Sequence, residues 1–255
     1  MQTAIDSVGA ARRNRLLAAL PDADWDSLKA QLAPVRMPLG SVLYESGATL
    51  SHVYFPTTAI IALLYVLSDG SSVEMAIAGR DGLVGVALFM GGETTPSRAV
   101  VQSEGWAFRL SGVALKAEFA RGGELQRLML RYTQALITQM TQTAVCNRHH
   151  SIDQQLCRWL LLALDCLDSP TVVMTQTMIA NMLGVRRDGV TNAAAKLQAA
   201  GLIKYSRGLI TVVDRPGLER RCCECYDVLR TECDRLLRGP IRAPVPDSES
   251  AHFVA

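Results

Sequence analysis

The sequence has no apolar run of the roughly 18–20 residues that a membrane-spanning helix needs. Its first residues, Met1–Ala11, also lack a basic stretch followed by an apolar stretch, so we expect no secretory signal. The net charge is only +2 over 255 residues, too small to indicate by itself a nucleic-acid or membrane surface as a partner. We therefore expect a cytoplasmic protein with no membrane partner. Hydrophobic residues make up 49% of the chain, enough for one large core or two smaller ones.

Cysteine is absent from the first half of the chain, since the first of the seven is Cys146. An odd number of cysteines without an export signal indicates reduced thiols rather than a disulfide framework. Four of them, Cys222, Cys223, Cys225 and Cys233, gather near the end, but without the paired two-residue gaps of a structural zinc site. On one helix, Cys222 and Cys225 would share a face with Leu218 and Leu229. We therefore predict buried core thiols and no metal site.

The first half of the chain combines a short helical segment with many short strands. Residues 1–11 resemble a loose tail, and residues 12–33 show helical spacing with a break at Pro21. From Pro34 to about Leu110, short apolar or alternating runs are separated by glycine-containing turn signals. These runs are Ser41–Glu45, His52–Phe55, Ile60–Leu67, Ser72–Ala78, Ala99–Ser103 and Trp106–Leu110. Short strands at such close spacing predict a β-sandwich or jelly roll, in a sensor domain over residues 12–120.

A long helix follows in residues 121–150, because no glycine or proline occurs between 124 and 151. Apolar residues recur along it at steps of three and four, forming a narrow seam of Leu125, Met129, Tyr132, Leu136 and Met140. A narrow seam with a polar opposite face favours a two-helix dimer contact. The alternative is that the seam packs on its own β-domain. Residues 147–151 are the expected hinge.

The last part of the chain, residues 151–237, predicts a small domain of helices and one hairpin, which makes the whole chain α+β. A helix over Ile152–Leu167 leads into two short helices joined at Gly184, within residues 175–197. A β-hairpin over Gly201–Asp214 and a final helix over Gly217–Leu237 follow. Residues 238–255 contain prolines and no periodic pattern, and we expect a disordered tail.

The two short helices at Gly184 have the pattern of a helix-turn-helix. One set of apolar positions can share a core: Ile179, Ala180, Leu183, Val185, Val190, Ala194 and Leu197. Polar residues are left on the outer face of the second helix: Arg186, Arg187, Asp188, Thr191, Asn192 and Lys196. A helix that opens with two arginines suits the DNA major groove, where arginine bonds to guanine O6 and N7. Arg207, at the tip of the following hairpin, is placed to contact phosphate as part of a wing.

Two stretches carry a resemblance to a known family: Thr-Gln-Thr-Met-Ile-Ala-Asn-Met-Leu-Gly-Val-Arg-Arg-Asp-Gly-Val-Thr and Gly-Leu-Ile-Lys-Tyr-Ser-Arg-Gly-Leu-Ile-Thr-Val-Val-Asp-Arg. Over about residues 15–237, the chain resembles the Crp/Fnr superfamily of bacterial transcription regulators. The resemblance implies a jelly-roll or β-roll sensor domain, a dimerisation helix and a winged helix-turn-helix. It also implies a homodimer without catalytic activity that binds double-stranded DNA at a palindromic operator, with RNA polymerase as a further partner to consider.

The resemblance assigns roles to the outer face of the second helix. Arg187 and Asp188 fall where the family commonly has an Arg-Glu pair that reads a G·C pair, although Asp188 is one methylene shorter. Arg186 stands where a serine often caps the helix, so the capping hydroxyl is missing. Thr191 and Asn192 are placed for a base or a phosphate, and Lys196 for a phosphate.

The sensor half departs from the nucleotide-binding members that it resembles. Their Gly-Glu-Leu turn and Arg-Ser-Ala segment correspond to Gly85-Val86-Ala87 and Ser97-Arg98-Ala99, so Val86 replaces the glutamate that takes the ribose hydroxyl. The reversed order of Ser97 and Arg98 would turn the arginine away from the pocket. Gly85, Ser97 and Arg98 are therefore weak effector-binding candidates, and Arg98 is equally well a solvated strand residue. Cyclic AMP in the usual pose is not expected.

Other cofactors of the family are not expected either. An iron–sulfur cluster needs cysteines in the N-terminal region, and a haem ligand there could come only from His52. The adjacent residues His149 and His150 would face different directions on a helix, so we expect no metal there. The effector stays open: an apolar or anionic ligand, cyclic di-GMP bound in another way, or no small ligand. A cupin-like metabolite-binding enzyme with an interaction domain is the alternative function, weakened because His52 is alone.

Overall fold

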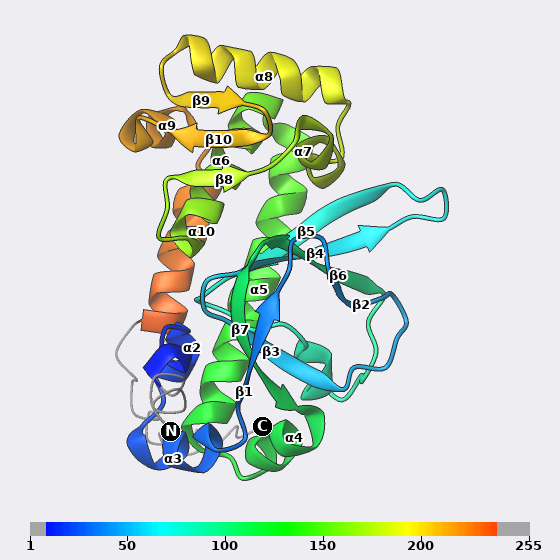
Figure 1. The fold of residues 1–255 in the computed structure, drawn as a ribbon, viewed down its shortest axis with the longest axis vertical. Coiled ribbons are helices and arrows are strands. Elements are labelled where there is room, and N and C mark those ends of the chain that lie inside the picture. Colours follow the sequence, from blue (N-terminus) through cyan, green and yellow to red (C-terminus); the bar gives the residue numbers. More distant parts are fainter. Residues whose placement is uncertain (1–8, 239–255) are drawn as a thin grey trace, which may run out of the picture.

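The computed structural model describes residues 9–238 and has a β-rich half, a long central helix and a mainly helical second half (Figure 1). The loose tail expected at 1–11 is corrected in part, because residues 9–11 are helical and Ala11 is buried, whereas 1–8 lie outside the described residues. Helices α2 (Arg15–Ala18) and α3 (Asp22–Lys29) follow, separated at Pro21 as the sequence predicts.

Antiparallel strands form a two-layered β-roll in the first half of the chain. One sheet has the strand order β1-β7-β3 and the other the order β2-β6-β4-β5. The strands are β1 (Ala33–Met37), β2 (Val42–Tyr44), β3 (His52–Pro56), β4 (Ile60–Val66), β5 (Ser72–Ala78), β6 (Ser97–Ser103) and β7 (Gly105–Ser111). All but β1 correspond to runs expected from sequence. The strand β1 was missed because Pro34 lies within it; proline is tolerated there because β1 is an edge strand.

The four-stranded sheet has two buried faces. Along β6, Ala99 and Val101 face the interior of the roll, where they join its hydrophobic core. On β4 and β5, Ile60 and Ile77 belong instead to the core of the second half of the chain. Because neighbouring strand residues point to opposite faces, this sheet separates the two cores. It is thus one of the elements through which the two halves touch.

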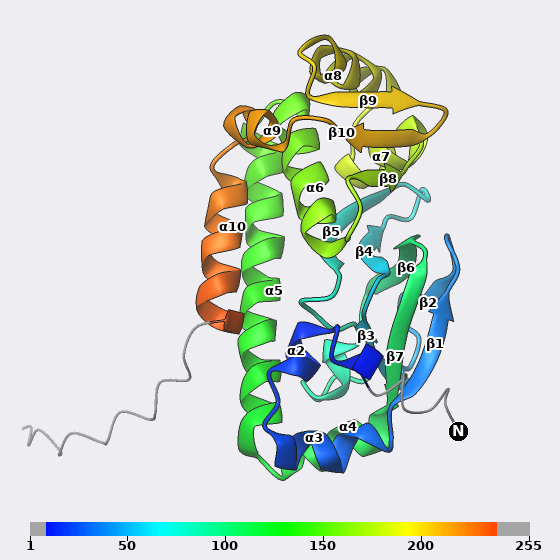
Figure 2. The ribbon, with the colours of Figure 1, turned by 60° about the vertical axis from the view of Figure 1, so that its left-hand side comes forward.

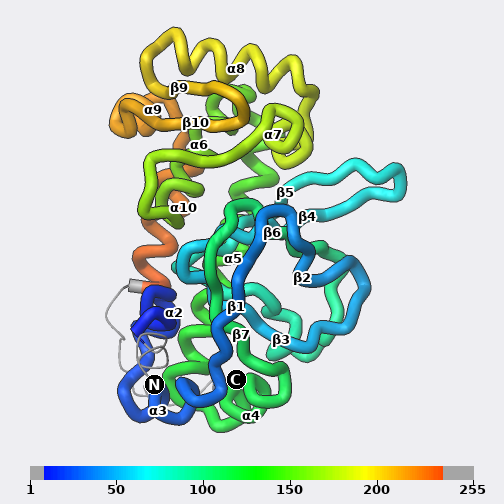
Figure 3. The backbone as a smooth tube through the Cα atoms, in the orientation of Figure 1, coloured from blue at the N-terminus to red at the C-terminus, as the bar shows by residue number. Residues whose placement is uncertain are grey.

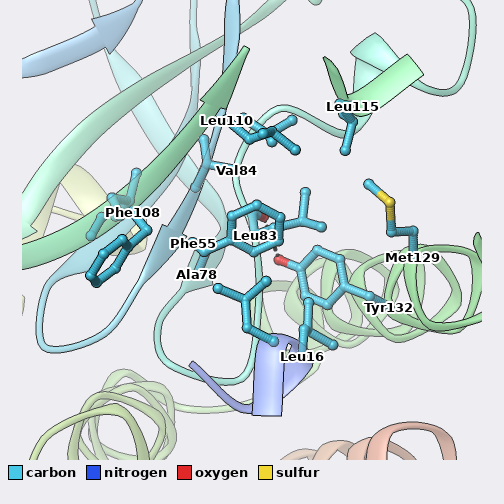
Figure 4. Close-up of a cluster of buried hydrophobic side chains, with 14 of the residues drawn as sticks. Leu16, Phe55, Ala78, Leu83, Val84, Phe108, Leu110, Leu115, Met129 and Tyr132 are labelled. Atoms are coloured by element: carbon cyan, nitrogen blue, oxygen red, sulfur yellow. Dashed lines mark hydrogen bonds between the residues drawn. The ribbon is translucent and has the colours of Figure 1, made fainter. Parts of the chain in front are cut away.

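The core of the roll also holds one face of the long helix α5 (Gly123–His149), which follows α4 (Gly112–Ala120). Figure 4 shows Tyr132 and Met129 of α5 among Phe55, Leu110 and other side chains of the roll. The Tyr132 hydroxyl donates a hydrogen bond of 2.9 Å to the Leu83 carbonyl oxygen.

This packing corrects the expected dimer seam. Four of its residues, Leu125, Met129, Tyr132 and Leu136, are buried within the single chain, and Met140 packs against the same core. The alternative interpretation, packing on the own β-domain, is the one that the structure supports. A different face of α5 is exposed, and its apolar residues are Leu130, Ile137 and Val145.

The second half consists of helices around a small sheet of order β8-β10-β9. Its elements are α6 (Ile152–Cys166), β8 (Thr171–Val173), α7 (Gln176–Leu183), α8 (Arg187–Ala199), β9 (Ile203–Ser206), β10 (Leu209–Val212), α9 (Arg215–Arg221) and α10 (Cys225–Cys233), followed by the π-helical turn Asp234–Arg238. The chain turns between α5 and α6 at His150 and Ser151; Ser151 caps α6 in a capping box with Gln154. None of the described helices is long and apolar enough to cross a membrane.

The final helix expected over Gly217–Leu237 is wrong in one respect, because it is two helices. Helix α9 ends at Arg221, and α10 begins at Cys225 and runs alongside α5 (Figure 2). Tyr226 and Leu229 of α10 are both buried, and the Tyr226 hydroxyl donates a hydrogen bond of 2.9 Å to Asp165 of α6. Of the tail expected at 238–255, residues 239–255 lie outside the described part of the chain.

The two halves pack directly on each other. The strands β4 and β5 lie beneath α7 (Figure 3), and the Gln102 amide approaches Met182 Sδ of α7 at 2.9 Å. Asp168, after α6, accepts hydrogen bonds from Arg13 at 2.9 Å and Arg80 at 2.5 Å. Helix α7 therefore rests on the outer face of the sensor sheet, whereas α8 packs on α6, α7 and β9.

Candidate nucleic-acid interface

The two helices around Gly184 form as the sequence predicts. Thr175 caps α7 by accepting a hydrogen bond from the Met178 amide, and Gly184 ends it in a left-handed conformation with φ +63°. Glycine suits this position because it adopts positive φ without strain. All seven apolar positions that were predicted to share a core belong to, or pack against, one hydrophobic cluster.

Helix α8 lies across one end of the molecule (Figure 1). The predicted outer-face residues are all exposed: Arg186, Arg187, Asp188, Thr191, Asn192 and Lys196. Arg186 is the residue before the first turn and makes no side-chain capping bond, as its missing hydroxyl implies. Asp188 in the first turn lies at the positive end of the helix dipole, where a carboxylate is favourable.

Gly189, in the first turn of α8, marks a close approach between helices. A Cβ atom at this position would lie 2.7 Å from the Ile152 Cδ1 atom at the start of α6. The glycine thus allows α6 to support α8 from behind, which the sequence alone did not show.

Two of the outer-face residues have partners within the protein. The Thr191 hydroxyl lies 2.9 Å from Gln176 Oε1 and 3.0 Å from the Arg187 carbonyl oxygen, so it can donate to either. Lys196 Nζ lies 3.6 Å from Asp153 Oδ1 of α6, and Asp153 also accepts a hydrogen bond from Arg221. Thr191 therefore connects α8 to α7, and Lys196 carries a charge partly balanced by Asp153.

The hairpin after α8 is a wing with a tight tip. Leu209 pairs with Ser206, so Arg207 and Gly208 form a two-residue turn, and both have positive φ. Two positive φ values define the type I′ turn that matches the twist of a hairpin. The Arg207 side chain is exposed at this tip.

The wing, α7 and α8 enclose a polar hollow of about 280 Å³. It is lined by Thr175, Gln176, Thr177, Arg187, Tyr205, Ser206, Arg207 and Gly208. Two guanidinium groups and several hydroxyl and amide groups thus share one concave surface, as contact with a phosphate backbone requires. The start of α7 and the strand β9 supply the residues that sequence reasoning missed, and the separation of these segments in sequence explains why.

The weak effector candidates do not form such a site. Arg98 Nε lies 3.1 Å from Oε2 of Glu45, the residue after β2, and the Ser97 hydroxyl lies 2.9 Å from that of Thr95. Gly85 has φ +111° and packs against the backbone of β3. A cavity of about 460 Å³ lies elsewhere, between the roll, α5, α6 and α10, and none of these three residues lines it.

A buried acid lies where the sensor sheet meets the second half. The Glu74 carboxylate on β5 accepts a hydrogen bond of 2.7 Å from the Gln102 amide of β6. Burial raises the pKa of Glu74 to about 8, while Gln102, Arg158 and Trp159 act in the opposite direction. Arg158 and Trp159 belong to α6, so two of the groups that favour the charged form of this carboxyl come from the second half of the chain.

The cysteines near the end of the chain are arranged differently from the expectation. Cys222 follows the last residue of α9, so it does not share one continuous helix with Cys225. Cys223 and Cys225 are buried beside Cys146 of α5, whereas Cys233 lies apart, at the cavity beside Tyr132. The prediction of buried thiols holds for Cys223 and Cys225, but their neighbours are in α5.

These features define a two-domain protein with a β-roll and a winged helix-turn-helix. Residues 34–121 match the family described as the cyclic nucleotide-binding domain, and residues 154–221 match the Crp-like helix-turn-helix domain. The chain belongs to the Crp/Fnr superfamily of transcription regulators, which are DNA-binding proteins and not enzymes. A search of curated protein sequences finds no match.

Solved structures share this fold at low sequence identity. FixK2 from Bradyrhizobium japonicum has a TM-score of 0.63 at 15% identity, over 75% of this chain and 98% of that one. A CRP-family transcriptional regulator from Thermus thermophilus has a TM-score of 0.60 at 18% identity, over 73% and 95%. The cyclic di-GMP-responsive regulator CLP from Xanthomonas campestris has a TM-score of 0.59 at 14% identity, over 76% and 100%.

Proposed function

We propose that the protein is a sequence-specific transcription regulator that acts in the cytoplasm as a homodimer on a palindromic operator. The observation that carries this proposal is the polar surface where Arg187 of α8 and Arg207 of the wing line one hollow. In this arrangement α8 enters the major groove, Arg187 bonds to guanine, and Asp188 accepts from cytosine N4. Arg207 and the start of α7 then contact the flanking phosphates.

The exposed face of α5 supports the homodimer. Leu130, Ile137 and Ala144 are exposed and lie seven residues apart, with Val145 beside them, so they form one stripe along the helix. Two copies of α5 packed along this stripe would be related by a two-fold axis. The same axis would relate two α8 helices, as half-sites about 34–36 Å apart on one face of DNA require.

Selection of binding sites from random DNA, followed by mobility-shift titration, tests the proposal. The wild-type protein should select a palindrome, and Arg187→Ala should lose about 1–3 kcal/mol of affinity for it, with relaxed discrimination at one G·C pair. Arg36→Ala, at an exposed position on β1, is the matched control and should bind normally. Binding without sequence preference at moderate salt would contradict the proposal. An equal loss on all sequences would make Arg187 a phosphate contact.

We further propose that a signal other than cyclic AMP in its usual pose acts through the roll. Val86 and the Arg98–Glu45 ion pair support this, because neither offers a free partner for a ribose or a cyclic phosphate. Cyclic AMP should leave the melting temperature unchanged, and a rise at sub-millimolar nucleotide would contradict the proposal. Cyclic di-GMP, to which CLP is described as responsive, belongs in the same thermal-shift series.

A further inference from the structure

Four side chains with metal-binding atoms meet where α5 ends. Cys146 lies in the last turn of α5 and His150 directly follows the helix, so the two residues are four apart and share one face. Cys223 comes from the turn between α9 and α10, and Cys225 is the first residue of α10. The three sulfur atoms and one ring nitrogen all lie within 4.8 Å of one another.

The distances in this cluster, which we call the Cys₃His cluster, agree with a tetrahedral zinc site. With Zn–S bonds of about 2.3 Å and Zn–N bonds of about 2.0–2.1 Å, a tetrahedral centre separates two sulfurs by about 3.8 Å and sulfur from nitrogen by about 3.5 Å. The Cys146 and Cys223 Sγ atoms are 3.6 Å apart. The Cys225 Sγ and His150 Nδ1 atoms are 3.5 Å apart.

The groups around the cluster hydrogen-bond to its residues and orient them, as the residues around the ligands of a metal site do. His150 Nε2 lies 3.3 Å from Glu224 Oε2, so a proton on Nε2 leaves Nδ1 free to bind a metal. The Gln155 amide donates to the His150 carbonyl oxygen at 2.9 Å and to that of Cys146 at 3.4 Å. The orientation of His150 is thus fixed from both ends.

The charge balance also fits. Cys146, Cys223 and Cys225 are buried, and three buried thiolates with one Zn²⁺ carry a net charge of −1. Arg158 of α6 is itself buried, and its Nη1 donates a hydrogen bond of 3.3 Å to Thr143, one helical turn before Cys146. Its positive charge lies where it would offset the charge of the loaded site.

We propose that Cys146, His150, Cys223 and Cys225 bind one structural Zn²⁺ ion that joins the end of α5 to the turn between α9 and α10. Four protein ligands leave no open position, which is typical of structural rather than catalytic zinc. The ion would fix the junction between α5 and α6, and with it the orientation of the DNA-binding domain relative to the sensor. This site is independent of the DNA sequence that α8 reads.

Metal analysis of the full-length protein, purified under reducing conditions and dialysed, tests the proposal. We expect about one zinc per chain, and X-ray absorption at the zinc edge should give three sulfurs and one nitrogen in the first shell. Replacement by Co²⁺ should give the visible absorption of tetrahedral cobalt and a thiolate charge-transfer band. Absence of zinc together with no cobalt band in reduced protein, or stoichiometric iron instead of zinc, would overturn the proposal.

Variants separate the ligands from their neighbours. Cys223→Ser and Cys225→Ser should each lose most of the zinc and the charge-transfer intensity, whereas Cys222→Ser and Cys233→Ser should keep both. Glu224 has an exposed side chain, so Glu224→Gln should fold normally. Its affinity for zinc should fall by about 10-fold or more. Equal zinc content in all five variants would overturn the proposal. It would also be overturned if protein purified without reductant, and with zinc supplied, contained a Cys146–Cys223 disulfide in place of the metal.

Discussion

The Tyr132 hydroxyl of α5 donates a hydrogen bond of 2.9 Å to the Leu83 carbonyl oxygen, in the core of the roll. Both groups are buried, so the bond joins the long helix to the loop after β5 inside the protein. The pair explains why the apolar seam that resembles a dimer contact faces inward.

Tyr132→Phe should lower the free energy of unfolding by about 1–3 kcal/mol, because it leaves the buried Leu83 carbonyl without this donor. Denaturant titration measures the change, with Tyr65→Phe, at an exposed tyrosine, as the control. The oligomeric state should not change. A loss of dimer without loss of stability would show that Tyr132 lies at a subunit contact after all.

The stripe on the opposite face of α5 should carry the dimer. Ile137→Asp places a charge at the centre of this stripe, so the dimer should dissociate because a buried unpaired charge is costly. Light scattering coupled to size-exclusion chromatography measures the mass, and affinity for a palindromic site should fall with it. Val113→Asp, at an exposed valine of α4, is the control and should leave the mass unchanged. If the Ile137→Asp protein were still a dimer, this stripe would be excluded as the dimer contact.

Glu74 should make stability depend on pH. Its pKa is raised from 4.5 to about 8 by burial, so between these values the folded protein holds a proton that the unfolded chain has lost. The free energy of unfolding should therefore fall as pH rises through this window, by up to about 1.4 kcal/mol per pH unit, and level off above it.

Glu74→Gln removes this titrating group. The free energy of unfolding of the variant should therefore exceed that of the wild type by more at pH 8 than at pH 5. Urea denaturation at a series of pH values measures it, with the exposed Glu104→Gln as the control. A constant difference between wild type and Glu74→Gln across the series would show that the carboxyl does not titrate in the window.

Lys196→Ala should weaken DNA binding equally on all sequences and reduce the slope of log affinity against log salt by about one. The Asp153 carboxylate forms ion pairs with both Lys196 and Arg221 and so balances part of their positive charge. Asp153→Asn should therefore strengthen the binding of DNA. Titrations at several salt concentrations measure both changes. A selective loss on the operator alone would place Lys196 at a base.

The helix-turn-helix was predictable because its determinants are local. Gly184, the capping Thr175 and the apolar spacing around them act within one or two helical turns, and the glycine turn at Arg207 does the same for the wing. The strands of the roll were also predictable, because turn signals separate them. Pro34 concealed β1, because a proline is compatible only with an edge strand. The residues of a single strand do not show whether it lies at the edge of a sheet.

What sequence could not give depends on contacts between distant segments. Two faces of α5 carry apolar residues, one at steps of three and four and one at steps of seven, and the position of the roll decides which is buried. Cys146 and Cys223 are 77 residues apart, and their approach depends on the break between α9 and α10. That break contains neither proline nor glycine, because residues 222–224 are Cys-Cys-Glu, so no local signal marks it.

Ile60 and Ile77, on the sensor sheet, are buried in the same core as Trp159 and Ile179 of the DNA-binding domain. Separating the domains would expose this shared surface to water, so neither domain can melt without weakening the other. Calorimetry should accordingly record one cooperative transition for the chain rather than two. On this expectation the regulator unfolds as a single unit, even though two families of domain can be recognised in its sequence.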